Sequence, residues 1–213
     1  MLGIYVNVPV AGFRKGHARE YLETHLIPPP ATCYGFLLSL IGERDRSRHI
    51  GCRVTSVIMT EPPKSVVLRK LWRVKNSRLG SPENIRPDFQ ELLSNLELIL
   101  WLDSTEERAA VCITLEERVK NALAQPKSIN RTGGLSLGES THLVNEVTLV
   151  NESPGFTMPV TGKAFLLDRK GNLTLPVWVD HVSSTQTRYV TGNLVPTKIK
   201  NLPRARIPVI SPD

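Results

Sequence analysis

Hydrophobic and polar residues alternate at the start of the chain and recur in denser apolar runs further on. Residues 2–8 predict a first β-strand, because a period of two turns one face of a strand toward the core. Residues 52–59 and 92–103 predict two further strands, the second of them buried, and residues 141–150 predict another. The pattern at residues 105–113 fits a strand or a helix equally well.

Two helices are predicted by their start and stop signals. Three prolines at residues 28–30 hold the chain extended, Thr32 stands at the expected N-cap, and Gly42 supplies the stop. Nearly every residue between them is apolar, which is typical of a helix buried against a sheet. The capping box Thr-Leu-Glu-Glu at 114–117 predicts a second helix over residues 115–124.

One narrow stripe of the first helix carries only small side chains, at Ala31, Gly35 and Ser39. Glycine inside a helix costs about 1 kcal/mol relative to alanine, so a compensating gain is expected at Gly35. Close packing on a strand is the more ordinary explanation. The alternative is close approach of a ligand to the helix N-terminus, where free N–H groups favour a phosphate.

Residues beyond 150 have the composition of a β-rich segment. Residues 163–167 and 173–179 predict the two strands of a hairpin, with its turn at residues 168–172. The tail, residues 195–213, mixes cations with prolines and predicts a poorly ordered or docking extension.

A strongly basic segment lies at residues 64–78, which hold six cations, one tryptophan and no acid. Its apolar spacing predicts a strand or a long β-hairpin arm, and residues 76–87 predict the loop at its tip or exit. Cations and a flat ring on such an arm are suited to splaying nucleotides.

A second basic segment, residues 11–25, combines cationic side chains with Phe13, Tyr21 and two glycines. Single-stranded nucleic acid is bound by this mixture of positive charge and aromatic rings. The segment therefore predicts a loop that lies on RNA or DNA.

A glycine-rich segment at residues 131–140 reads Arg-Thr-Gly-Gly-Leu-Ser-Leu-Gly-Glu-Ser. Its spacing imitates a P-loop, but Glu139 replaces the essential lysine and a strand, not a helix, is expected to follow. These departures argue against nucleotide hydrolysis. The segment can still bring backbone N–H groups close to an RNA backbone, with a plain tight turn as the alternative.

The composition indicates a protein able to form a sizeable core, with 213 residues, 40% of them hydrophobic, and a mean hydropathy of −0.14. No apolar run reaches membrane-spanning length, and the N-terminus does not have the pattern of a signal peptide. Cys33, Cys52 and Cys112 form no close pair, which predicts reduced core cysteines in a cytoplasmic protein without a metal site.

The net charge of +7 is unevenly placed along the chain. Residues 1–90 hold 14 Lys and Arg against 7 Asp and Glu, residues 91–162 hold 5 against 10, and residues 163–213 hold 8 against 3. Two basic regions flanking an acidic one indicate a polyanionic partner, with a merely solvated basic surface as the alternative. No basic amphipathic helix is visible, so a membrane partner is not expected.

Residues 43–50, Glu-Arg-Asp-Arg-Ser-Arg-His-Ile, predict a solvated charged turn. The histidines outside the basic loop show no partner pattern in the sequence. We expect His49, His142 and His181 to be ordinary surface or core residues.

Residues 1–150 resemble the fifth CRISPR-associated (Cas) family, RAMP-superfamily subunits that cap the 5′ end of the guide RNA in type I Cascade complexes. The resemblance rests on the opening strand, the loop from Phe13 to Tyr21, the helix Pro-Pro-Pro-Ala-Thr-Cys-Tyr-Gly-Phe-Leu-Leu-Ser-Leu-Ile-Gly and the segment Leu-Ser-Leu-Gly-Glu-Ser at 135–140. It is most specific at residues 11–42.

The resemblance implies an α+β fold. A ferredoxin-like (RRM-like) domain would span residues 1–150 with a β-hairpin thumb at about 64–87, and a β-rich extension would span 151–213. It also implies contacts with the crRNA 5′ handle and with the backbone and large subunits, indirect contact with target DNA, and no cofactor. The residues then expected to bind RNA are Arg14, Lys15, His17, Arg19, Thr32, Gly35, Arg69, Lys70, Trp72, Arg73, Gly134, Leu137, Gly138 and Ser140.

One branch of the family processes precursor guide RNA without metal, through a His, Lys and Tyr constellation. His17, His25, Lys15 and Tyr21 lie close enough in sequence to form such a group, yet the same residue types suit a passive clamp. We expect a non-catalytic crRNA-binding subunit in antiviral defence or RNA-guided DNA targeting, with the endoribonuclease as the alternative. An RRM-like module with an unrelated nucleic-acid or protein partner is a third possibility.

Overall fold

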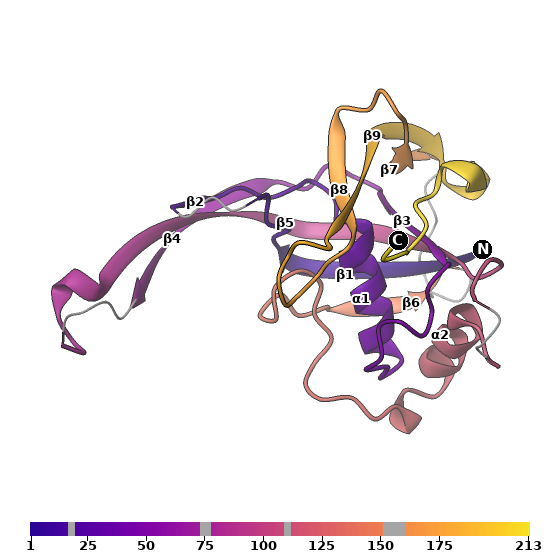
Figure 1. Ribbon diagram of the computed structural model, residues 1–213, viewed down its shortest axis with the longest axis horizontal. Helices are drawn as coiled ribbons and strands as arrows, with labels where there is room; N and C mark the ends of the chain where they lie inside the picture. The colour runs from indigo at the N-terminus through magenta and orange to yellow at the C-terminus, as the bar shows by residue number, and fades with distance from the viewer. Residues whose placement is uncertain (17–19, 73–77, 109–111, 151–160) are drawn as a thin grey trace.

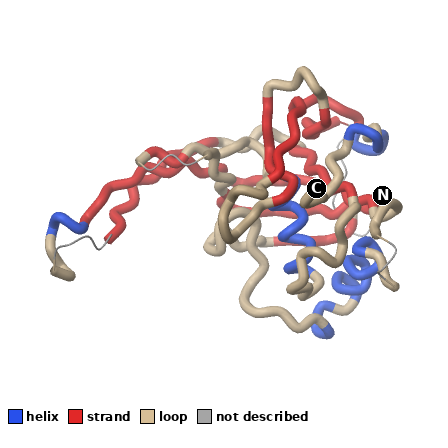
Figure 2. The backbone as a smooth tube through the Cα atoms, in the orientation of Figure 1, coloured by secondary structure: helices blue, strands red, loops and turns tan. Residues whose placement is uncertain are grey.

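The computed structural model describes residues 1–16, 20–72, 78–108, 112–150 and 161–213. Within these residues a single, mostly antiparallel sheet is accompanied by two α-helices, so the fold is α+β (Figures 1 and 2). The strands are β1 (Leu2–Ala11), β2 (Tyr21–Leu22), β3 (Arg53–Ile58), β4 (Lys64–Trp72), β5 (Ile85–Asp103), β6 (Glu146–Leu149), β7 (Thr161–Leu167), β8 (Leu173–Trp178) and β9 (Arg188–Lys198). The helices are α1 (Pro30–Leu40) and α2 (Leu115–Ala124), with short 3-10 turns at Pro82–Asn84, Pro126–Ser128, Ile199–Asn201 and Arg204–Arg206.

The strand order is β6-β1-β5-β3-β7-β9-β8, and β2 and β4 also pair with β5. The strands predicted at 2–8, 52–59 and 92–103 are confirmed as β1, β3 and β5. The strand predicted at 141–150 is shorter, because regular pairing with β1 covers only residues 146–149. The chain after residue 160 joins the same sheet through the pairing of β7 with β3.

The main core lies between one face of the sheet and the two helices. Alternate residues of β1 and β5 point into it, and both α1 and α2 pack on it, as the alternation and the apolar helix predicted. The opposite face carries a smaller core, to which β1, β3, β5 and β7 contribute residues and which the tail covers through Ile199, Leu202 and Ile207. Burial of these apolar surfaces is the main force that holds the layers together.

Helix α1 begins two residues earlier than its predicted N-cap. Pro29 is the N-cap residue, Pro30 is the first helical residue, and no side chain caps the helix. Proline suits this position, because its fixed φ is helical. The backbone N–H that proline lacks would have no hydrogen-bond partner within the helix at this position. The prediction of Thr32 as the N-cap was therefore wrong, whereas the stop is confirmed by Gly42, with φ of 69°, just beyond the helix end.

Helix α2 has the predicted bounds and the predicted cap. The Thr114 hydroxyl accepts a hydrogen bond from the Glu117 N–H, and the Glu117 carboxylate accepts one from the Thr114 N–H. The preceding segment, for which strand and helix were both open, contains neither at residues 104–108 and 112–113.

Strands β4 and β5 form the predicted basic arm as a long hairpin that projects from the body (Figures 1 and 2). Residues 85–93 of β5 pair with β4, residues 93–102 pair with β1, and residues 98–103 pair with β3 on the other side. The predicted tip loop therefore ends at Asn84, because residues 85–87 already belong to β5. Arg73 lies outside the described residues, as do His17 and Arg19 of the first basic loop.

The hairpin predicted for residues 163–179 was wrong in its pairing. The turn exists, with Gly171 N–H donating to Asp168 O at 3.0 Å, but β7 and β8 each pair with β9 instead of with each other. Strand β9 is long enough to pair with both strands, since its residues 192–198 pair with β7 and its residues 188–192 pair with β8. The tail is a docked extension rather than a poorly ordered one, with Ile207 and Ile210 fully buried.

The charged turn at residues 43–50 is only partly solvated. His49 is fully buried, and its ring lies 3.2 Å from Glu107 and 2.9 Å from Arg118. Arg118 also pairs with Glu43 at the end of α1. Burial raises the pKa of Glu43, but hydrogen bonds from Arg118 and from backbone N–H groups outweigh it and hold that pKa at about 2.

Two of the three cysteines match their prediction. Cys33 and Cys52 are unpaired core residues, whereas Cys112 is unpaired and exposed. Cys112 follows the last turn before α2 instead of lying on a core-facing strand, so its prediction as a core residue was wrong.

Candidate nucleic-acid interface

The small-residue stripe of α1 faces a groove that lies open to solvent. Two adjoining hollows of about 380 and 300 Å³ share Gly35, Leu38 and Ser39. We call the two hollows together the α1 groove. Its walls come from three further segments of the chain: the turn after α1, the glycine-rich loop and the start of the β8–β9 connection.

Gly35 is exposed in the floor of this groove. A Cβ atom built on it would meet no atom within 4 Å outside its own helix. The interpretation that Gly35 permits close packing on a strand is therefore wrong, because the strands lie on the opposite side of the helix. Close approach of a ligand stays a prediction for this residue.

The glycine-rich loop forms one wall through Ser136 and Gly138. Gly138 has φ of 99°, and a Cβ on it would lie 2.6 Å from the carbonyl oxygen of Gly12, so only glycine fits this turn. His142 holds the turn by accepting hydrogen bonds at Nδ1 from the N–H groups of Gly12 and Glu139. Burial lowers the pKa of His142, which favours the neutral ring that this acceptor role requires.

The other residues expected in this loop occupy different positions. Gly134 and Ser140 are exposed but line neither hollow of the groove, whereas Leu137 is fully buried in the core. The Leu137 N–H and carbonyl group lie in the loop backbone, where the N–H donates to His142 O at 3.0 Å. Leu137 can therefore support the wall but cannot present its side chain to a ligand.

Basic side chains line the groove at several points. Arg44 and Arg131 lie at one end, and Arg46 and His181 lie at the other. Thr32, predicted from the helix start, lines the same hollow as Gly35, Ser136 and Gly138. An open groove with a bare backbone floor and cationic rims is suited to a nucleic-acid backbone.

The arm is tied to the glycine-rich loop by a polar bridge. Arg69 pairs with Glu139 at 3.6 Å and bonds the side chain of Gln90, which in turn donates to Glu139 at 2.7 Å. The charge of Arg69 is thus largely balanced by Glu139 within the protein. Lys70 and Trp72 lie on the other face of the arm and are exposed.

That exposed face of the arm is mainly apolar. Tyr21 stacks on Phe89 at 6.4 Å between ring centroids, and alternation along the hairpin places Leu68 and Trp72 on the same side. The exposed fractions of Phe89, Leu68 and Trp72 are 45%, 55% and 57%. A surface of this kind is typical of a site that another macromolecule covers.

The first basic loop is folded back on itself beside the arm. Arg14 is exposed, and its backbone forms an isolated antiparallel β-bridge with Thr24. The backbone N–H of Lys15 donates to Glu23 O at 2.8 Å. Desolvation and the charge of Lys15 lower the pKa of His25. Tyr21 donates its hydroxyl to Glu91 at 3.3 Å.

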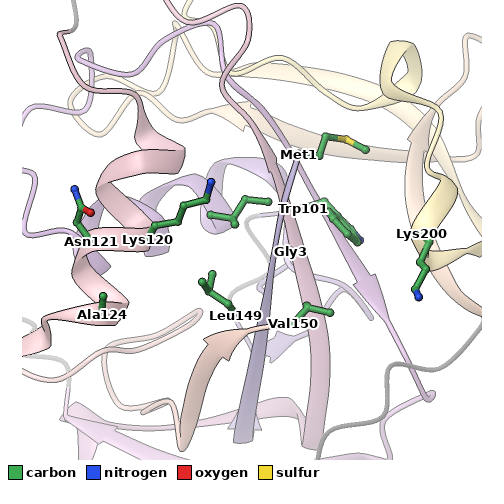
Figure 3. Close-up of a pocket in the computed structure, with 10 residues that line it drawn as sticks. Met1, Gly3, Trp101, Lys120, Asn121, Ala124, Leu149, Val150 and Lys200 are labelled. Carbon is green, nitrogen blue, oxygen red and sulfur yellow. The ribbon is translucent and has the colours of Figure 1, made fainter. Parts of the chain in front are cut away.

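A separate hollow of about 790 Å³ lies between α2 and the edge of the sheet (Figure 3). Trp101 and Val150 contribute to its lining from the sheet, and Lys120 and Asn121 do so from α2. It contains none of the residues that the sequence indicated. Among the described residues no group of three or more His, Cys, Asp or Glu side chains is arranged to hold a metal ion.

Sequence reasoning missed the residues that complete the α1 groove. Arg44, Arg46 and His181 were assigned to a solvated turn or to ordinary positions, because nothing local indicates what they face. Arg46 lies with its guanidinium carbon 4.0 Å from the ring centroid of Trp178, a contact across 132 positions in sequence. The cluster of arginines at 44–48 was the available sequence signal for a basic site, but it does not show which arginine faces the groove.

Comparison with solved structures supports the class of this fold. A chain described as a CRISPR RNA-guided surveillance complex matches with a TM-score of 0.63 at 12% identity, covering 92% of this chain and 90% of that chain. A second, described as a crystal structure of a Cas protein, matches with a TM-score of 0.51 at 16% identity, covering 100% and 99%. The fold is thus one that occurs among CRISPR-associated proteins.

The sequence comparison identifies the family. No family model matches the chain. A curated protein of Myxococcus xanthus (strain DK1622), CRISPR-associated protein Cas5, is 49% identical over 210 residues, which is 96% of both chains. The chain belongs to the Cas5 family. Within the described residues, no helix is long and apolar enough to cross a membrane.

Proposed function

We propose that this chain is a Cascade subunit that binds the 5′ handle of the crRNA in the α1 groove. The observation that carries the proposal is Gly35, a helical glycine left open to solvent in a groove with cationic rims. The bound RNA backbone passes over Gly35 and against the N–H groups of the glycine-rich loop near Gly138. Thr32 and Arg131 lie where they can bond the phosphates.

The arm acts as the thumb of this subunit. Its exposed face combines Lys70 with Trp72 and the apolar residues beside them, so it can contact a displaced base and a neighbouring protein at once. We assign this face to the guide and to the adjoining backbone subunit. The large subunit contacts another part of the chain and links it indirectly to target DNA.

The fold supports a ferredoxin-like core. The chain order β1-α1-β3-β5-α2-β6, together with the sheet order β6-β1-β5-β3, follows the split β-α-β plan of that fold. We assign residues 1–150 to this domain and residues 151–213 to its β-rich extension.

We propose that the chain binds RNA without cutting it. A metal-independent cut needs a base, an acid and a cation that converge on one phosphate. Lys15 lies close enough to His25 to lower its pKa, but the Tyr21 hydroxyl is bonded to Glu91, so the described members of the alternative group do not all converge. His17, the remaining candidate, lies outside the described residues.

The test is a single set of samples run on native and denaturing gels without metal. The full chain is mixed with end-labelled repeat RNA carrying either its own 5′ handle or a scrambled one. A shift that depends on the handle, with intact RNA on the denaturing gel, is the expected result. A discrete cut that is lost in His25→Ala or His17→Ala would instead assign the chain to the processing branch.

A chain that does not shift the RNA alone is then co-expressed with the backbone subunits and the guide. Guide that co-purifies with the assembled complex only when this chain is present supports the proposal. Equal guide protection in a complex lacking this chain overturns it.

A further inference from the structure

Arg46 lies in the wall of the α1 groove, where its charge is held by an aromatic ring and not by a carboxylate. The side chain is half-buried, and among the described residues no carboxylate lies within 4.0 Å of its guanidinium. The neighbouring Arg48 and Arg118 both pair with Glu43, whereas Arg46, like Arg44, has no ion pair among the described residues. A guanidinium without a carboxylate partner keeps its N–H donors available to a ligand.

The position of Arg46 is fixed from two sides. Its guanidinium carbon lies 4.0 Å from the centroid of the Trp178 ring, and its backbone carbonyl accepts a 2.7 Å hydrogen bond from the Tyr34 hydroxyl. Tyr34 in turn packs on Trp178, with ring centroids 6.5 Å apart. Preorganisation of this kind lowers the entropy that a ligand contact would otherwise cost.

The β8–β9 connection completes the site opposite α1. The Asp180 carboxylate accepts hydrogen bonds from the N–H groups of Val182, Ser183 and Gln186, which order the turn. The Ser183 hydroxyl and these N–H groups hold the pKa of Asp180 well below its usual range. The ordered turn holds Val179 and His181 in the wall of the hollow that contains Arg46.

We propose that Arg46, supported by Trp178, is a specificity-determining residue that binds one unstacked nucleotide of the guide beside His181. This inference rests on the proposed function of the α1 groove. The hollow of about 380 Å³ is at the small end of ligand sites, which suits a single nucleotide. Unstacked RNA bases are commonly stacked on arginine planes and aromatic rings and are bonded along their edges.

The test compares Arg46→Lys with Arg48→Lys as a matched control in the same turn. Lysine keeps the positive charge but loses the planar fork and the stack on Trp178. Arg46→Lys is expected to weaken binding of handle RNA about tenfold, the scale of one lost stacked or bidentate contact. Arg48→Lys is expected to bind as the wild-type chain does. Equal melting temperatures confirm that both variants are folded.

A scan with single abasic sites along the handle shows whether the contact is to one nucleotide. At one position the abasic RNA should weaken the wild-type chain and leave Arg46→Lys unchanged. If Arg46→Lys binds like the wild type, or if every abasic site weakens both proteins equally, the inference is overturned. A wild-type chain without handle-dependent binding, alone and in its complex, overturns the proposed function itself and this inference with it.

Discussion

Replacing Gly35 should change the stability of helix α1 and the binding of RNA at its exposed face in opposite directions. A Cβ at this position meets no neighbouring atom, so Gly35→Ala adds no clash. Alanine is favoured over glycine inside a helix by about 1 kcal/mol. For a chain of this size that gain raises the melting temperature by about 2–4 °C. Gly35→Leu should give a similar gain, because leucine is nearly as good a helix former.

Binding should change in the opposite direction. The leucine side chain would stand in the floor of the groove, between Ser136 and Gly138 on one side and Arg44 and Arg131 on the other. We expect Gly35→Leu to weaken handle binding at least about tenfold, which corresponds to about 1.4 kcal/mol. Gly35→Ala, with one methyl group, should have a smaller effect.

The assay measures melting temperature and RNA affinity on the same preparations. Asn121→Leu is the matched control, since it places leucine on an exposed position of α2 that does not line the α1 groove. A Gly35→Leu chain that is more stable and still binds handle RNA as the wild type does would refute the close-approach argument. A Gly35→Leu chain that melts earlier would refute the claim that the site is open.

Two further predictions concern stability and chemistry away from the groove. The pKa of Glu43 is about 2 in the folded chain and near 4.5 when unperturbed, so its contribution to stability is present above pH 4.5 and is lost as the pH falls toward 2. The difference in melting temperature between wild type and Arg118→Gln should therefore be largest above pH 5 and shrink toward pH 2–3; a constant difference would contradict the argument. Burial raises the pKa of Cys33 to about 12 and that of Cys52 well above its usual value, so a thiol reagent should label only Cys112 in the folded chain and all three after denaturation. Rapid labelling of either buried thiol in the native state would contradict this prediction, because it would show that the core around the thiol opens to solvent.

Local patterns in the sequence were sufficient for most elements of the body. The alternation in β1, the apolar run of β5 and the capping box of α2 each reflect forces between near neighbours in sequence, and each element was found where it was predicted. The helix start was misplaced by three residues, from an N-cap at Thr32 to one at Pro29, because a proline at the first helical position and a threonine at the cap are competing signals. Pro30 prevailed, since it already has the φ that the helix requires.

Long-range geometry decided what the sequence left open or assigned wrongly. The turn at residues 168–172 was recognisable, but the pairing of β7 and β8 with β9 depends on a strand that begins at residue 188. The small stripe of α1 is compatible with burial or exposure until the position of the sheet is known. Arg46 is distinguished from its neighbouring arginines only by its contact with Trp178.

The polar bridge between the arm and the glycine-rich loop assigns different roles to the basic residues of the arm. Arg69 is held by Glu139 and Gln90, so moving it toward a phosphate would leave Glu139 without its cation. Its predicted place among the RNA-binding residues is therefore better understood as positioning, because it fixes the arm relative to the wall that carries Gly138. Lys70 and Trp72 lie on the opposite, exposed face and can reach a ligand without breaking any contact of the body. We propose that the arm and the α1 groove act together on the guide, because Arg69 and Gln90 both bond Glu139 in the glycine-rich loop, which also forms a wall of the groove.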